Sequence, residues 1–359
     1  MWIAKASPFQ ASQPRTFLYV NNNDFENSVS AFSVGSDGRL QPLQGSPFPT
    51  GGIGGRIPNI DAIAVSKKTS QLFVTNNRDN TLTGFQIGSD GRLTRFPSPP
   101  LFTGGTNPSG VAVNKKGSLV FVANMGSDSI ASFSVTPTGS IRPVNGSPFL
   151  SGNGPVSLVT NKNSTLLFAS HHFSTSVGAY QIGSDGRVTF LESYQTLGSG
   201  QQGVALQRSS SSLYVASMTS SSISAFKADL NNGQLRLVNG SPFFTNGSRP
   251  LDVVAHPKGN FVYVCNNNTS TISVFSVAAD GSLRQISGSP FNTDGIAPAA
   301  MAINSAGTLL FVVNGGFGGS KDVSVYRIDS SGRISPVAGS PFTTGSIGVP
   351  ASITLLELS

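Results

Sequence analysis

The sequence is poor in several residue types on which enzyme and metal chemistry commonly depend. Its 359 residues include one cysteine, one tryptophan, three histidines and three glutamates, and only 11% of the chain is charged. A single cysteine, Cys265, excludes an internal disulfide framework and any site with several cysteine ligands. No nucleophile elbow, zinc-protease helix or phosphate-binding loop occurs, so we expect no metal and no cofactor.

Long apolar segments are also missing. No run of 18 apolar residues is present, and we therefore expect no membrane span. The N-terminus lacks the apolar core, roughly 7 to 15 residues long, of a secretory signal. The protein is therefore expected to be cytoplasmic, or secreted with its signal peptide absent from this chain. We expect a monomer.

Glycine and proline, in contrast, are abundant. The chain has 41 glycines and 22 prolines, and serine, asparagine and threonine recur throughout. This composition favours short strands joined by tight turns over helices.

Three sequence markers repeat along the chain at one period. A Tyr/Phe-Val-x-Asn-like segment starts at seven aromatic residues, spaced 46 to 54 residues apart: Tyr19, Phe73, Phe121, Phe168, Tyr214, Tyr263 and Phe311. A turn that closes on glycine before an aliphatic residue follows each segment, as in Asp37-Gly-Arg-Leu. The tetrapeptide Gly-Ser-Pro-Phe occurs at 45–48, 146–149, 240–243, 288–291 and 339–342, with a degenerate copy at 99–102. Four antiparallel strands at a period in the forties predict propeller blades.

We therefore predict an all-β fold: a single seven-bladed β-propeller over residues 1–359, with four antiparallel strands per blade. The blades are expected to begin near residues 16, 59, 107, 155, 201, 250 and 298. The chain enters at a second-strand segment, and residues 350–358 resemble an innermost strand. The C-terminal strand is therefore expected to complete the first blade and close the ring, which removes exposed sheet edges.

These motifs resemble the YVTN-repeat, lactonase-like seven-bladed propellers over nearly the whole chain. That group includes 6-phosphogluconolactonases, carboxy-muconate lactonising enzymes and repeat proteins of no known activity. The resemblance implies a lactonase or lactone-forming isomerase that acts without a cofactor on a small anionic, sugar-acid-like substrate. The alternative is a non-catalytic, secreted or surface-associated scaffold or binding propeller, which the low charge and near-uniform repeats favour.

The net charge of +7 and the pI near 9.7 do not indicate nucleic-acid binding. The arginines recur on the predicted outer strands and the lysines in the turns between the first two strands of each unit, and no aromatic residues suited to base stacking accompany them. Charge spread around a circumference is typical of solvated edge strands, so we expect no nucleic-acid partner.

The innermost strands supply the first candidate site residue. Aligning these strands places small residues around the axis, except for one acid: Ala62, Gly110, Ser157, Gly203, Asp252, Ala300 and Ser352. Asp252 is therefore expected to lie at the central channel and to be partly buried. It either pairs with Arg249 of its own linker or faces a ligand.

Two loops between second and third strands depart from the asparagine-rich pattern of the others. The fourth unit has His171 and His172, of which only one can face the channel mouth, because adjacent residues on a strand point to opposite sides. The second unit has Arg78, and its unusual linker has Arg56. The resemblance implies a proton-transferring role for His171, His172 or Asp252 and anion binding by Arg56, Arg78 and Arg249. The stretch at 77–80 lacks the Gly and His that phosphogluconolactonase-like members often carry.

Overall fold

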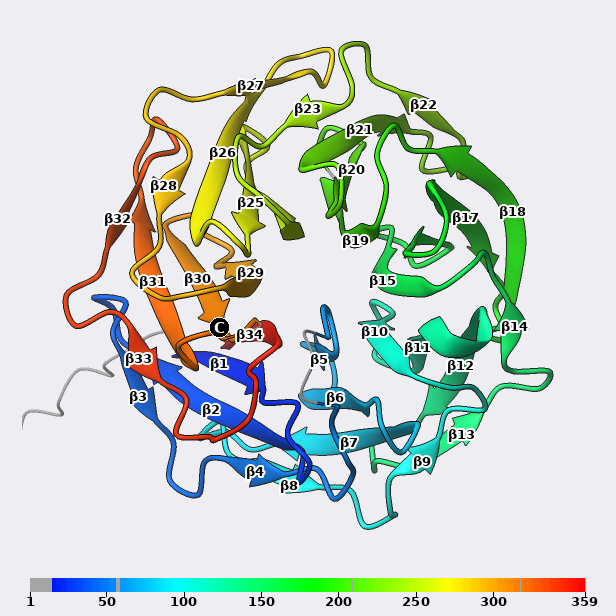
Figure 1. Ribbon diagram of the computed structural model, residues 1–359. Helices are drawn as coiled ribbons and strands as arrows, with labels where there is room; N and C mark the ends of the chain where they lie inside the picture. Colours follow the sequence, from blue (N-terminus) through cyan, green and yellow to red (C-terminus); the bar gives the residue numbers. More distant parts are fainter. Residues whose placement is uncertain (1–14, 56–58, 208, 317, 359) are drawn as a thin grey trace, which may run out of the picture.

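A computed structural model describes residues 15–55, 59–207, 209–316 and 318–358. The chain forms a ring of seven β-sheet blades around a central axis (Figure 1). The predicted all-β, seven-bladed propeller with four antiparallel strands per blade is confirmed. The described residues contain one helix, the 3₁₀ turn η1 (Met125–Ser127). None of their helices is long and apolar enough to cross a membrane.

Blade one contains the C-terminal strand, and blades two to seven follow in chain order. The innermost strands of blades one to seven are β34 (Ser352–Leu358), β5 (Ile63–Ser66), β10 (Pro108–Val113), β15 (Pro155–Thr160), β19 (Gln201–Gln207), β24 (Pro250–Ala255) and β29 (Pro298–Ile303). The second strands are β1 (Arg15–Asn21), β6 (Gln71–Asn76), β11 (Leu119–Asn124), β16 (Leu166–His171), β20 (Ser212–Ser217), β25 (Phe261–Asn266) and β30 (Leu309–Asn314).

The third strands are β2 (Ser28–Val34), β7 (Thr81–Ile87), β12 (Ser129–Val135), β17 (Ser176–Ile182), β21 (Ser222–Ala228), β26 (Thr271–Val277) and β31 (Asp322–Ile328). The outer strands are β3 (Leu40–Pro42), β8 (Leu93–Arg95), β13 (Ile141–Pro143), β18 (Val188–Gln195), β22 (Leu235–Leu237), β27 (Leu283–Gln285) and β32 (Ile334–Pro336). Six blades add a two-residue strand that pairs with the third strand: β4 (Phe48–Pro49), β9 (Leu101–Phe102), β14 (Phe149–Leu150), β23 (Phe243–Phe244), β28 (Phe291–Asn292) and β33 (Phe342–Thr343).

The C-terminal strand closes the ring, as expected from the sequence. β34 pairs antiparallel with β1 over seven residues, from Arg15 opposite Leu358 to Asn21 opposite Ser352. Leu356 is fully buried between blades one and two, in a cluster with Phe17 and Tyr19. The two ends of the described chain therefore form one blade.

The core consists of apolar clusters between adjacent blades. One cluster lies at each of the seven junctions, and second- and third-strand side chains of the two neighbouring sheets make up most of it, with residues of the inner and outer strands added. The largest buried side chains are the aromatic residues of the repeats, such as Tyr19, Phe73 and Phe121. Because each blade buries both of its faces, the stability of each blade depends on its neighbours.

The Gly-Ser-Pro-Phe motif ends the outer strand and protects the edge of the sheet. In blade seven, β32 stops pairing after three residues, and the Ser340 Oγ accepts a hydrogen bond from the Val325 backbone N–H at 3.0 Å. Phe342 then pairs with Val323 at the start of the third strand. The same serine-to-backbone bond occurs in blades one, three, five and six. The motif serine thus satisfies the backbone donor that the short outer strand leaves unpaired.

We expect Ser340→Ala to lower the free energy of unfolding by about 1–3 kcal/mol, because the Val325 N–H loses its partner in a partly buried site. Ser335→Ala, on the exposed face of the same outer strand, is the control and should change stability by less than about 0.5 kcal/mol. The midpoint of urea unfolding measures both effects. Equal midpoints for the two variants would contradict this role of the motif serine.

Candidate functional site

The axis of the propeller is lined by the seven innermost strands, and small residues allow those strands to approach closely. A Cβ atom added at Gly110 would lie 2.4 Å from the Val156 backbone oxygen of blade four. One added at Gly203 would lie 2.6 Å from the Asp252 Oδ1 of blade six. Glycine is therefore required at both positions because a side chain would overlap the neighbouring strand.

Asp252 lies at this axis, where the strand alignment places it, and is 3% exposed. Its Oδ1 accepts a hydrogen bond from the Val253 N–H at 2.8 Å, and its Oδ2 accepts one from the Met301 N–H of blade seven at 2.7 Å. Both hydrogen bonds that it makes within the described residues therefore come from strand amides and not from Arg249. Burial raises the pKa of Asp252 well above its usual range, the charge of Asp61 raises it further, and the two amides oppose this shift.

Asp61 is a second acid at the axis, one residue before the aligned position in blade two. The Ser157 hydroxyl of blade four donates a short hydrogen bond to the Asp61 Oδ2, and it accepts one from the Val204 N–H at 3.0 Å. Asp61 has a φ of 57°, in the left-handed region, where Asp is tolerated better than most residues. Burial raises the pKa of Asp61 from 3.8 to about 6, and the Ser157 bond opposes this shift.

The two acids line one cavity of about 320 Å³ in the channel. Aliphatic side chains from six blades supply the rest of the wall, including Ile63, Val111 and Val204. Because carboxylates are poorly solvated beside such side chains, the pair favours a state in which one of the two carries a proton.

A second cavity, of about 190 Å³, lies at the entry ends of the same strands. It contains two of the residues singled out from the sequence, His172 and Arg249. Its other lining residues are Asn59, Asn107, Ser109, Met125, Val156, Gln202, Met218 and Leu251. Most of these lining residues precede the channel-lining residues by one to four positions along the inner strands. This cavity, called the mouth cavity below, and the channel cavity therefore lie at successive depths along the axis.

His172 enters the mouth cavity from the loop that follows β16. Within the described residues, both hydrogen bonds of its imidazole involve Nδ1, at 3.2 Å from the Gln201 backbone oxygen and 2.8 Å from the Gln202 amide nitrogen. The Gln201 carbonyl can only accept and favours a proton on Nδ1, whereas the Gln202 amide nitrogen can only donate and favours a lone pair there. In the tautomer protonated at Nδ1, Nε2 keeps its lone pair and is the ring atom left to meet a ligand.

Arg249 reaches the mouth cavity from the linker before β24, and its backbone is held in the left-handed region with a φ of 61°. The equivalent residues before β10, β15, β19 and β29 are Asn107, Gly154, Gly200 and Ala297, with φ of 49°, 66°, 68° and 58°. The left-handed conformation is therefore a feature of this repeat position, where glycine is the least strained residue.

His171, the other candidate histidine, lies inside blade four and is fully buried. Its Nδ1 is 3.0 Å from the Ser176 Oγ, and its Nε2 is 3.0 Å from the Tyr180 hydroxyl. Burial lowers the pKa of His171 from 6.5 to about 4. Five of the other blades have asparagine at this position, and blade five has Ser217. Asn266, for example, donates to two side chains of its third strand. His171 therefore takes the role of the asparagine that links the second and third strands in those blades. It lines neither cavity.

The remaining candidates lie elsewhere. Arg78 is exposed, with its guanidinium 5.0 Å from the centre of the Phe25 ring, and it does not line the mouth cavity. Arg56 lies outside the described residues. Within residues 15–55, 59–207, 209–316 and 318–358, no three His, Cys, Asp or Glu side chains are grouped so that they could hold a metal ion.

Sequence reasoning singled out neither Asp61 nor Gln202 as a site residue. An acid one residue before the aligned position was the available signal for Asp61. Gln202 occupies the same position in blade five, directly before the aligned axial residue Gly203.

A family model described as "Lactonase, 7-bladed beta-propeller" matches residues 8–160, 147–246 and 239–347 of the chain. No curated protein sequence gives a significant match. Similar solved structures include a protein from Bacteroides fragilis provisionally named a 6-phosphogluconolactonase, with 15% identity, a TM-score of 0.78 and coverage of 98% of this chain and 100% of the other. The periplasmic gluconolactonase of Pseudomonas aeruginosa has 18% identity, a TM-score of 0.77 and coverage of 97% and 100%. At these low sequence identities, the likeness shows that the proteins share this fold.

The packing around His171 predicts a compensating pair of substitutions. A Cβ added at Gly178 would lie 2.7 Å from the His171 ring, so Gly178→Ser should destabilise the protein by about 1–3 kcal/mol. The double variant His171→Asn/Gly178→Ser recreates the arrangement of blade one, where Asn22 bonds to Ser28 and Ser30. We expect its free energy of unfolding to exceed, by at least about 1 kcal/mol, the value obtained by adding the effects of the two single substitutions. Additive unfolding free energies would contradict this packing account.

The buried acid pair predicts that Asp61→Asn stabilises the protein at neutral pH. Because the folded-state pKa of Asp61, about 6, exceeds the ordinary 3.8, ionisation lowers stability as pH rises through that window. The uncharged asparagine avoids this cost, so we expect a gain of up to about 3 kcal/mol at pH 8 that disappears near pH 4. Urea unfolding at the two pH values measures it, with exposed Glu26→Gln as the charge-matched control. A loss of stability at pH 8 would overturn this account.

Proposed function

This chain belongs to the lactonase family of seven-bladed β-propellers, and from that membership we propose that it opens or closes the lactone ring of a small anionic acid. The proposed site is the mouth cavity together with the acid pair beneath it. The names of the solved propellers of similar fold, a 6-phosphogluconolactonase and a gluconolactonase, favour a sugar-acid lactone as substrate.

One observation carries the proposal: His172 and Arg249 line the same cavity, although they come from blade four and from the linker into blade six. A proton acceptor and a permanent cation are the two groups that hydrolysis of an anionic lactone needs most. Arginine binds a carboxylate or a phosphate through paired, charge-assisted hydrogen bonds, and so it can orient the substrate. A small polar cavity with two methionines beside these groups suits a compact ring.

The proposed chemistry uses side chains and water alone. Arg249 holds the anionic group, and the Nε2 of His172 takes a proton from a water molecule that attacks the lactone carbonyl carbon. The bond between that carbon and the ring oxygen then breaks, and the imidazolium returns its proton to the ring oxygen. This role needs the tautomer protonated at Nδ1, in which the Gln201 carbonyl accepts from Nδ1 and stabilises the imidazolium.

Asp252 and Asp61 form the acidic part of the proposed site, in the channel cavity beneath the mouth cavity. Burial raises the pKa of both carboxyls, and the charge of Asp61 raises that of Asp252 further. Either carboxyl could therefore exchange a proton with channel water at a pH where ordinary carboxylates cannot. If Asp252 is the proton acceptor in place of His172, Asp252→Asn should abolish turnover while His172→Gln leaves most of it.

The test is a panel of purified lactones that contains phosphorylated, carboxylated and uncharged members. We expect turnover of an anionic member, and we expect His172→Gln to lower kcat by about 10²- to 10⁴-fold with little change in KM. The folded fraction is checked by thermal melting. Absence of turnover across the whole panel by the unchanged protein would favour the non-catalytic scaffold.

Arg249→Gly provides a sharper prediction, because glycine accepts the backbone conformation while the guanidinium is lost. We expect stability to stay within about 1 kcal/mol of the parent. The KM for an anionic lactone should rise at least about tenfold, and the KM for an uncharged lactone should change little. Ala297→Gly is the matched control: Ala297 also precedes an inner-strand proline, has a φ of 58° and bears no charge. An unchanged KM for the anion in Arg249→Gly would remove Arg249 from the site.

A further inference from the structure

The outer ends of several blade junctions are filled by an arginine from one blade and an aromatic ring from the previous blade. Arg187 of blade four lies 5.5 Å from the Phe149 ring centre and donates to the Asn145 backbone oxygen at 3.3 Å. Arg333 of blade seven repeats this over Phe291 at 5.4 Å. The phenylalanine in each case belongs to the Gly-Ser-Pro-Phe motif. Each such ring is therefore covered by a cation from within the chain.

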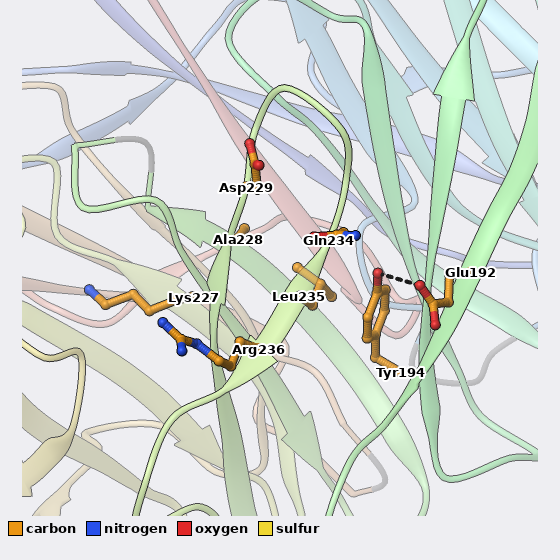
Figure 2. Close-up of a pocket in the computed structure, with 8 residues that line it drawn as sticks. All are labelled: Glu192, Tyr194, Lys227, Ala228, Asp229, Gln234, Leu235 and Arg236. Atoms are coloured by element: carbon orange, nitrogen blue, oxygen red, sulfur yellow. Dashed lines mark hydrogen bonds between the residues drawn. The ribbon is translucent and has the colours of Figure 1, made fainter.

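The junction between blades four and five keeps the ring but lacks the cation. Tyr194 pairs with Val177, as Phe149 pairs with Ile130 in blade three, so Tyr194 occupies the position of the motif phenylalanine. Gln234 follows the turn glycine, where blades four and seven have Arg187 and Arg333. A groove of about 600 Å³ lies there, lined by Tyr194 and Gln234 (Figure 2).

Two other junctions also lack the arginine but differ in what remains. Between blades two and three, Ser140 replaces the arginine and Leu101 replaces the aromatic residue, so there is no ring to cover. Between blades five and six, Ser282 replaces the arginine, but Lys227 packs against the turn glycine Gly281 and provides a positive charge.

The charged side chains around the blade four–five groove lie on two faces of blade five. On the groove side, Glu192 accepts a hydrogen bond from the Tyr194 hydroxyl at 2.9 Å. Lys227 and Arg236 are cross-strand neighbours that point away from Tyr194 in Figure 2, and Lys227 approaches Gly281 of blade six. The groove thus presents a carboxylate beside an aromatic ring.

A long outer strand forms one wall of this groove. β18 is eight residues long, whereas each of the other six outer strands has three. It contains no proline, and Phe190 and Leu191 on it are 49% and 40% exposed. β18 ends the hydrogen-bonded order of its sheet, so its outer backbone groups can pair with another extended chain.

We propose that this groove binds an extended segment of another polypeptide that carries an arginine, with its guanidinium over the Tyr194 ring and paired with Glu192. The segment adds as a strand to the unpaired outer edge of β18. The arginine of the partner thus takes the place that Arg187 or Arg333 occupies elsewhere in the ring. This interaction is independent of the mouth cavity and of lactone turnover.

The test uses the full chain and a labelled peptide, N-acetyl-Val-Arg-Val-Glu-Val-amide, in fluorescence anisotropy. We expect saturable binding that weakens at least about fivefold when citrulline replaces arginine, because citrulline keeps the shape and loses the charge. N-acetyl-arginine amide alone should bind more weakly than the peptide, because it cannot pair along β18. Equal binding of the arginine and citrulline peptides would overturn the proposal.

Gln234→Arg is the decisive variant because it supplies the missing cation from within the chain. We expect it to melt at or above the temperature of the parent and to weaken peptide binding at least about tenfold. Gln41→Arg, on the exposed outer strand of blade one, adds the same charge and should leave binding unchanged. Undiminished peptide binding by Gln234→Arg, or an equal loss in Gln41→Arg, would contradict the assignment of the groove.

Discussion

The crowding of seven innermost strands around one axis is the constraint on which the rest of the structure depends. It demands small residues such as Gly110 and Gly203 where neighbouring strands meet, because their positions leave no room for a side chain. It also requires the ring to be complete, and β34 completes it by pairing with β1 along its full length. The apolar clusters between blades then stabilise the same arrangement from outside the axis.

A charge is costly at such an axis, and the two acids that occur there are therefore informative. Asp252 and Asp61 lie among aliphatic side chains that disfavour ionisation of both, and the charge of Asp61 further disfavours ionisation of Asp252. Strand amides and the Ser157 hydroxyl compensate only partly. Directly above them, the mouth cavity brings together His172 and Arg249, the latter in a backbone conformation that glycine adopts more easily. Costly features at successive depths of one channel are typical of a site kept for function at the expense of stability.

The repeat markers were sufficient to predict the fold and its closure, because three independent signals shared one period and the chain began at a second strand. The axial position of Asp252 also followed from aligning the inner strands. The burial of His171 could not be predicted, because it depends on Gly178 and Tyr180, whose contacts appear only after blade four is folded. Asp61 was missed as a site residue because its left-handed backbone moves the acid into the axis from one position outside the aligned column. The bonds of Asp252 to strand amides, in place of Arg249, depend on the approach of blade seven.

The central claim is that the mouth cavity holds an anionic lactone between Arg249 and His172 above the two axial acids. A crystal structure of the protein with a bound aldonate, the ring-opened product of a sugar lactone, tests it most directly. The account predicts an anionic group of the aldonate on the Arg249 guanidinium and a carboxylate oxygen within hydrogen-bond distance of the His172 Nε2. Aldonate bound at another surface, with the mouth cavity filled only by water at saturating concentration, would contradict it.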